Sequence, residues 1–282
     1  MITIMKLLIK LLIKLLKTVF IILLTVMIIG IAAIKILSST ILDEAYVFRK
    51  LRSSNYYDSI YQELKSNFEN YIGPSGLEES VLDDICTVED IQNDTETILG
   101  NIYEGTNKKV DTTAIQERLK NNIEKSLNQL KETKQADPNI DQFVEEISNE
   151  YINTISHTDY EEKLNNVYQK AIQIIKIGKI GLWIASIIII ILLIVLNIKS
   201  INRALANIGI SFASAGAFII SGYYILMYNI RIEHLRVLNN SISMAFQEAI
   251  REIFNNINSA GIIIGIIGIV LIILGNILKK DK

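Results

Sequence analysis

Four apolar stretches constrain this chain more than any other feature of its sequence. Each is long enough to cross about 30 Å of hydrocarbon as a helix that rises 1.5 Å per residue. The run 184–196 contains no charged residue, which is unusual for a helix in the core of a water-soluble protein. We therefore predict an all-α integral membrane protein. Its transmembrane helices are expected at residues 18–37, 177–198, 204–228 and 260–278.

Charge is divided unevenly between the apolar stretches and the long segment that separates the first two. Residues 38–175 contain 26 Asp and Glu against 13 Lys and Arg, a net charge of −13, whereas the remainder contains 4 against 15, a net charge of +11. An acidic segment argues against nucleic acid or an anionic lipid surface as its partner. It is compatible with cations, cationic peptides or a basic protein, and equally with a plain solvated surface.

The chain begins with a basic amphipathic segment, residues 1–17, in which four lysines share one helical face and leucines and isoleucines fill the rest. They are Lys6, Lys10, Lys14 and Lys17. We expect this helix to lie in the cytoplasmic headgroup layer, bound to anionic lipid, before the chain turns into the first span near Thr18. A cleaved signal peptide is the competing interpretation of the same basic and apolar start.

The early lysines also predict the orientation, because basic residues near the first span favour the cytoplasmic side. Four spans then return the carboxyl terminus to the cytoplasm. We expect a multi-pass protein of the plasma membrane with both termini inside. The loop 199–203 and tail 279–282 would be cytoplasmic, and residues 38–176 and 229–259 extracellular.

Small residues recur on the third and fourth spans at a spacing that favours close helix packing. The predicted packing positions are Gly209, Ala213, Ala217, Gly261 and Gly265. Small faces let helix backbones approach where lipid removes the hydrophobic driving force. The sequence leaves open whether these faces pack within one molecule or form a homo-oligomer.

The acidic segment carries apolar residues at steps of three or four, which predicts helices throughout. The first span is expected to extend outward as a stalk ending at 73–76. Further boundaries are expected at the Thr87 and Asp90 cap, at Gly105, at an N-cap on Asp111, and at Pro138. A last helix from near Asp159 should run unbroken into the second span.

These helices predict an extracellular bundle of four or five helices with its own core. Core positions should include Leu64, Phe68, Ile123 and Ile147. The segment 229–259 has the same periodicity. It is expected to form a helical hairpin broken near Asn239 and Asn240, or an amphipathic stretch on the outer leaflet.

Motifs that carry chemistry are few in this sequence. His157 and His234 belong to no metal-binding or nucleophilic motif, and a single cysteine, Cys86, can form no intrachain disulfide. The acidic cluster 78–84 lacks the alternating oxygen ligands of a calcium loop. We predict no catalytic, cofactor-binding or metal site and classify the protein as a non-enzyme without a cofactor.

One stretch and the overall layout each resemble known proteins. Residues 56–103, with the sequence Asn-Tyr-Ile-Gly-Pro-Ser-Gly-Leu at 70–77, resemble uncharacterised four-span membrane proteins of low-GC Gram-positive, clostridia-like bacteria. The layout of one span, a large outer segment and three more spans also looks like FtsX-type membrane partners of cytoplasmic ATPases. The chain departs from that type in its all-helical insert and its short 199–203 loop.

Together these features favour a non-enzymatic plasma-membrane interaction or sensory protein that recognises an extracellular partner or ligand through its helical domain. The alternative is a transport-associated subunit or pore-forming oligomer, partnered with a cytoplasmic ATPase. Expected partners are membrane lipids and an extracellular or membrane protein, with no nucleic acid.

Overall fold

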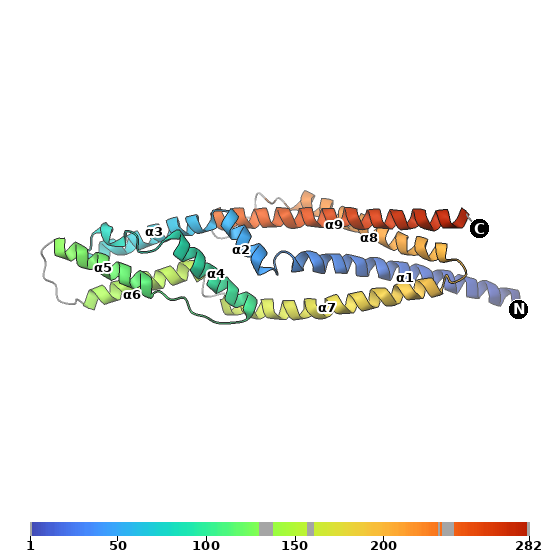
Figure 1. Ribbon diagram of the computed structural model, residues 1–282, viewed down its shortest axis with the longest axis horizontal. Coiled ribbons are helices and arrows are strands. Elements are labelled where there is room, and N and C mark those ends of the chain that lie inside the picture. Colours follow the sequence, from blue (N-terminus) through green and yellow to red (C-terminus); the bar gives the residue numbers. More distant parts are fainter. Residues whose placement is uncertain (1, 130–137, 157–160, 231, 233–239, 281–282) are drawn as a thin grey trace. The chain divides into compact units, whose positions relative to one another are not determined.

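The computed structural model describes residues 2–129, 138–156, 161–230, 232 and 240–280 (Figure 1). All regular elements among these residues are helices, as predicted. The chain divides into two compact units. Unit 1 comprises residues 1–43, 173–238 and 246–282, and unit 2 comprises residues 44–172 and 239–245.

Unit 1 is built from four long helices that follow the four apolar stretches. They are α1 (Ile2–Ser38), α7 (Glu161–Val195), α8 (Ile201–Asn229) and α9 (Asn240–Lys280). Each contains a segment long and apolar enough to cross a membrane: Ile4–Ser38, Asn165–Val195, Ile201–Asn229 and Phe246–Leu278. The predicted four spans are confirmed at this level, and the chain is a multi-pass membrane protein.

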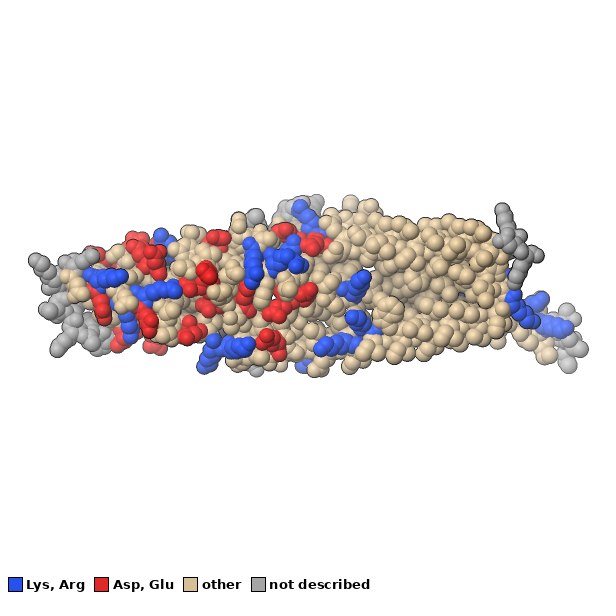
Figure 2. Space-filling model, viewed as in Figure 1, with Lys and Arg blue, Asp and Glu red and all other residues tan. Residues whose placement is uncertain are grey.

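The outer surface of these helices is apolar. Ile184, Ile187 and Ile191 on α7 are each more than half exposed, as are Ile263 and Ile266 on α9. Figure 2 shows that the long helices present an uncharged surface between their ends, while acidic and basic side chains are interspersed on unit 2. Such a surface is costly in water and favourable in hydrocarbon.

Helix α1 lies against α7 and α8. Leu24, Leu193 and Ala215 are fully buried at the centre of this contact. Beside them, the Thr25 hydroxyl donates to the Ile21 carbonyl at 2.9 Å and to the Ser211 carbonyl at 3.3 Å, and Ser211 Oγ donates to Ile21 O at 3.2 Å. Hydroxyls in an apolar interior need such partners, so the two helices are joined by polar as well as apolar contacts.

Helices α8 and α9 touch through glycines. A Cβ atom placed on Gly216 would lie 2.5 Å from Gly265 N and 2.7 Å from Gly261 O. A Cβ on Gly209 would lie 2.8 Å from the carbonyl oxygen of Gly268. No side chain fits at these points, which places Gly209, Gly261 and Gly265 in a contact within one molecule.

Ala213 belongs to the same contact, because Gly268 faces its backbone. Ala217 does not: it is exposed, and Gly216 occupies the interface instead. The prediction repeated a step of four, whereas a helix has 3.6 residues per turn, so the buried face moves back by one position.

Two helix boundaries differ from the prediction. Helix α1 continues through Thr18 without a turn and ends at Ser38, where residues 39–43 separate it from the next helix, so there is no continuous stalk. Thr40 Oγ1 donates to Ile36 O at 2.7 Å and competes with the helical backbone at this point. Helix α9 starts at Asn240, where a break was predicted, and runs on into the fourth span. Residues 231 and 233–239, including the predicted break at Asn239, lie outside the described part.

The described residues of unit 2 form five α-helices and one 3₁₀ turn. They are α2 (Glu44–Ser53), α3 (Tyr56–Ser75), η1 (Glu79–Leu82), α4 (Val88–Glu104), α5 (Thr113–Gln129) and α6 (Pro138–Ser156). The first turns of α7 belong to this unit as well. Helix α3 is central, with contacts to α2, α4, α6 and η1. A helical bundle of the predicted size is therefore present.

The core of unit 2 agrees with the predicted positions. Leu64, Phe68, Ile123 and Ile147 are each at most 2% exposed. They belong to one cluster of buried side chains that also includes Tyr151, Leu119, Ile91 and Cys86. The cluster draws on α3, α4, α5, α6 and the η1 segment, so burying it fixes the arrangement of these elements.

Local signals fix the ends of α4. Thr87 and Asp90 form a complete capping box, in which Asp90 N donates to Thr87 Oγ1 at 3.1 Å and Thr87 N donates to the Asp90 carboxylate at 2.9 Å. Gly105 ends the helix with φ +70°, a left-handed conformation that favours glycine. The Asp111 carboxylate accepts a hydrogen bond from Thr113 N at 3.0 Å where α5 begins.

Replacing Gly216 by valine should separate α8 from α9, because the added carbons would overlap the α9 backbone. We expect a loss of about 1–3 kcal/mol, measured as a lower melting temperature of the detergent-solubilised protein. Gly222→Val is the matched control, since nothing lies within 4 Å of a Cβ there. Equal melting temperatures for the two variants would contradict the packing.

Ile147→Ala should destabilise unit 2 by about 2–5 kcal/mol, because the side chain is fully buried in its core. The thiol of Cys86, 5% exposed and the only one in the chain, reports unfolding through its labelling by a maleimide across a denaturant series. Lys125→Ala, on the exposed face of α5, is the control and should label as the unmodified protein does. If Cys86 of the Ile147→Ala variant were labelled at the same denaturant midpoint as in the original protein, the result would contradict this core.

Candidate functional site

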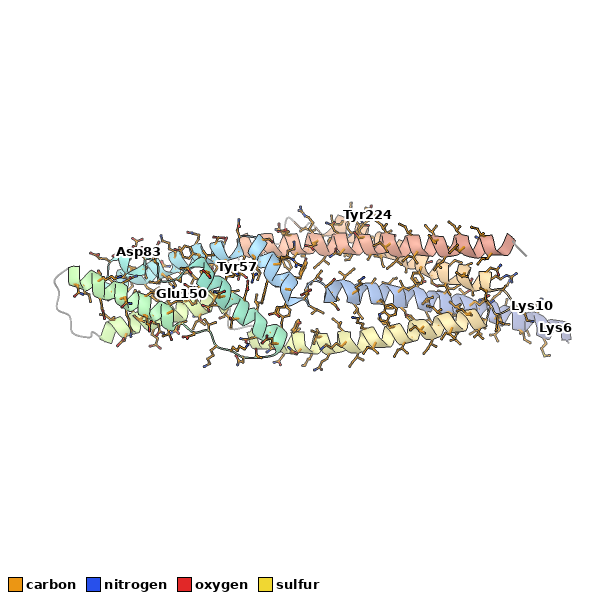
Figure 3. All side chains as sticks on the ribbon, viewed as in Figure 1. Lys6, Lys10, Tyr57, Asp83, Glu150 and Tyr224 are labelled. Carbon is orange, nitrogen blue, oxygen red and sulfur yellow. The ribbon has the colours of Figure 1, made fainter. Side chains whose placement is uncertain are left out.

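The basic residues predicted at the membrane surface all lie at the amino-terminal end of α1. Figure 3 labels Lys6 and Lys10 there. Lys6, Lys10 and Lys14 are exposed, and so are nearly all the apolar side chains between them. Lys17 differs, because it is partly buried and its Nζ donates to Asn197 Oδ1 at 2.6 Å. The structure therefore separates Lys17 from the other three lysines.

Asn197 was not predicted as part of any site. It is 3% exposed, and its amide donates to Leu193 O at 2.7 Å while its oxygen accepts from Lys17. This bond joins α1 to the turn between α7 and α8. A partly buried ammonium needs an acceptor, and Asn197 is a polar residue at the end of the second span, which is the signal that could have identified the pair.

A cavity of about 210 Å³ in unit 2 lies between α3 and the segment around η1. Its rim carries Lys65 and four carboxylates, from Glu69, Glu79, Asp83 and Asp84. All five side chains are exposed, and none forms an ion pair within the part of the chain that the structure describes. Figure 3 labels Asp83 on this rim.

The floor of this cavity is apolar. Phe68, Ile85 and Cys86 line it, and each is at most 5% exposed. Burial raises the pKa of the Cys86 thiol to about 12, with the Asp90 carboxylate adding to the rise and Arg118 opposing it. The thiol is therefore neutral near pH 7 and is not an activated nucleophile.

A second, more open hollow of about 370 Å³ lies along α4 and is lined by Glu44, Glu96, Glu104 and Lys108 among others. The loop that follows α4 is held by the side chain of Asn101. The Asn101 amide nitrogen donates to Lys108 O at 2.7 Å, and its oxygen accepts from Lys108 N at 3.0 Å. The hydroxyl of Thr106 donates to the same oxygen at 2.8 Å. These bonds tie residues 106 and 108 to α4 and use the Asn101 side chain to hold the loop.

Other carboxylates of unit 2 join helices to one another. Glu96 on α4 accepts from Arg52 Nε at 2.7 Å and from Tyr57 OH at 3.1 Å. Asp94 on the same helix accepts from Tyr151 OH at 2.6 Å. The Arg52 guanidinium holds the pKa of Glu96 below its usual value, while burial raises that of Asp94.

Two further links involve α5 and α6. Arg118 on α5 donates to the Asp90 carboxylate at 2.5 Å and to Ile85 O at 3.2 Å. The hydrogen bond from Arg118 to Asp90 lowers the pKa of Asp90. Glu150 on α6 accepts from Asn67 Nδ2 at 2.8 Å and Tyr71 OH at 3.2 Å. Since these carboxylates are already hydrogen-bonded between helices, they are better suited to hold the bundle together than to transfer protons.

Across residues 2–129, 138–156, 161–230, 232 and 240–280, no three His, Cys, Asp or Glu side chains are grouped to hold an ion. His157 and His234, the two residues weighed for such a role, lie outside this part.

Comparison with known proteins adds no identification. No protein-family model matches the chain, no curated protein is similar to it, and no solved structure matches its fold. The predicted likeness to four-span proteins and to FtsX-type proteins therefore remains a prediction.

Unit 2 should lose stability in acid. The lowered pKa of Asp90 means that its ionised form stabilises the fold above pH about 4, its usual pKa, and that this contribution is lost as the pH falls through its lowered value. Arg118→Met should cost about 1 kcal/mol at pH 7, and the gap from the unmodified protein should narrow towards pH 3. Urea unfolding of the full chain, followed by far-UV circular dichroism, measures both.

Lys120→Met provides the control for this comparison. Lys120 pairs with Asp141 at 3.0 Å, but both side chains are at least half exposed, so little effect is expected at any pH. A gap for Arg118→Met that stayed constant from pH 7 to pH 3 would show that Asp90 ionisation is not the cause.

Proposed function

We propose that the protein is a non-enzymatic interaction or sensory protein of the plasma membrane. In this proposal unit 2 lies outside the cell and recognises a protein partner or ligand. The spans then pass on a change in their packing. The proposal is supported by a compact helical unit that has its own cluster of buried side chains and draws most of its sequence from the segment between the first two apolar helices.

The surface of unit 2 supports a location in water. Among its described residues, Val167 is the only large apolar side chain that is strongly exposed, at 65%. The spans of unit 1 have the opposite character, with apolar residues exposed along their length. A surface that is charged and free of apolar patches is suited to selective contact with a partner and not to insertion into lipid.

The proposed sidedness is supported by the basic residues of unit 1. The start of α1, the turn between α7 and α8, and the end of α9 lie at one end of this unit (Figure 1). That end carries Lys6, Lys10, Lys14, Lys199 and Arg203. Basic residues beside the first span favour the cytoplasmic side, which would leave unit 2 on the other.

Photo-crosslinking in intact cells tests the recognition. A photoreactive amino acid in place of Glu79, on the rim of the α3 cavity, should give a discrete adduct with a partner. The same amino acid in place of Gln142, on the exposed face of α6, is the control and should give less. Protease added outside the cells should cleave unit 2 before lysis.

Several outcomes would count against the proposal. Resistance of unit 2 to external protease, followed by cleavage after lysis, would reverse the sidedness. Adducts that are identical at the two positions would remove the evidence for a recognition surface. Co-purification of a cytoplasmic ATPase in mild detergent, without any adduct of unit 2, would favour the transport-associated alternative.

A further inference from the structure

Three lysines mark the end of unit 1 that lies opposite the amino terminus. Lys35 is near the end of α1, and Lys176 and Lys179 are on α7. The two helices run antiparallel and touch here: a Cβ on Gly178 would lie 3.6 Å from Ile34 Cδ1, and one on Gly30 would lie 3.0 Å from Leu182 Cδ1. These contacts place Lys35 at the same level as Lys176 and Lys179.

Two of the three lysines share one side of the α1–α7 pair, and the third lies beside them on the outer face of α7. Each residue advances about 100° around a helix, and the two helices run in opposite directions. Counted from the Ile34 and Gly178 contact, Lys35 and Lys179 turn to the same side. Lys176 is about 200° around α7 from Gly178, so it points away from α1, on the face that also carries Ile180. All three are exposed. Figure 2 shows a group of basic side chains at this end of the uncharged surface.

No acidic side chain neutralises this group within the part of the chain that the structure describes. None of the three ammonium groups forms an ion pair or a hydrogen bond there. Three unpaired positive charges at one level repel one another, and they gain most from an anion with several oxygens, such as a phosphate.

The surface next to the lysines is apolar and belongs to the membrane-spanning part of α7. Ile180, Trp183 and Ile187 follow Lys176 at helical spacing and are 63%, 52% and 52% exposed. Tryptophan is favoured at the level of lipid headgroups, where its ring is in apolar surroundings and its N–H can donate a hydrogen bond. The lysine amines match the phosphate of a phospholipid, and the adjacent apolar stripe matches its acyl chain.

We propose that Lys35, Lys176 and Lys179 form a binding surface for the headgroup of an anionic phospholipid, whose acyl chain lies along Ile180 and Ile187. A lipid fits better than a protein segment because the same surface continues without a break into the lipid-facing side of α7. This inference concerns unit 1 alone and is independent of which side of the membrane unit 2 occupies.

Trp183 provides a local measurement, because it is the only tryptophan in the chain. The full chain is reconstituted in phosphatidylcholine vesicles with a minor fraction of phosphatidylglycerol, and either lipid is brominated on its acyl chains. Brominated phosphatidylglycerol should quench Trp183 as strongly as if its concentration beside the tryptophan were about fivefold higher than in the bulk bilayer. A fivefold enrichment corresponds to about 1 kcal/mol, the attraction of roughly one lysine to an anionic surface. Brominated phosphatidylcholine should quench in proportion to its bulk fraction.

The variant K35Q/K176Q/K179Q should lose this enrichment, and its quenching by brominated phosphatidylcholine checks that Trp183 stays in the bilayer. K6Q/K10Q/K14Q removes as many charges from the other end of α1 and should keep the enrichment. Equal quenching by the two lipids, or enrichment that survives K35Q/K176Q/K179Q, would overturn the proposal. Loss of the enrichment on adding inorganic phosphate would overturn it in favour of a soluble anion.

Discussion

The structure depends on the absence of water in the bilayer core. A backbone that crosses hydrocarbon must satisfy its own hydrogen bonds, and in this chain long helices meet that requirement. The same environment removes the hydrophobic force between helices, so α8 and α9 associate through backbone contact at Gly209 and Gly216. Hydroxyls that would be hydrated in water, such as those of Thr25 and Ser211, instead bond to carbonyls of neighbouring turns.

Unit 2 follows the opposite rule, because water surrounds charged groups at its surface and the apolar side chains gather inside. Its helices are joined both by the core around Leu64 and Ile147 and by carboxylates that accept hydrogen bonds from Arg52, Arg118 and tyrosines. Removing one partner of such a link leaves a half-buried charge without compensation, which costs more than the link itself contributes. The polar links therefore specify which helices pair, while the core supplies most of the stability.

Periodicity and composition predicted the four spans, the all-helical insert, its core positions and the Thr87 capping box, since each of these depends on residues close in sequence. The break after Ser38 was missed because a local Thr40 hydrogen bond decides it and the surrounding pattern remains helical. The bond between Lys17 and Asn197 joins residues 180 positions apart, and the exchange of Ala217 for Gly216 depends on the position of α9. The cavity beside α3 was also beyond a sequence pattern, because periodicity does not specify how the segment around η1 folds back against α3.

One lysine lies at each end of the apolar part of α1, and their spacing determines the bilayer thickness that this helix matches. Lys17 and Lys35 are 18 positions apart, which corresponds to about 27 Å along a helix, slightly less than an average hydrocarbon thickness of about 30 Å. A thicker membrane would draw one ammonium group into hydrocarbon unless the lipid thinned around the protein, and a thinner one would be matched by tilting. Lysine side chains can also extend toward the headgroups, so the spacing of these two charges is expected to favour a hydrocarbon thickness near this length.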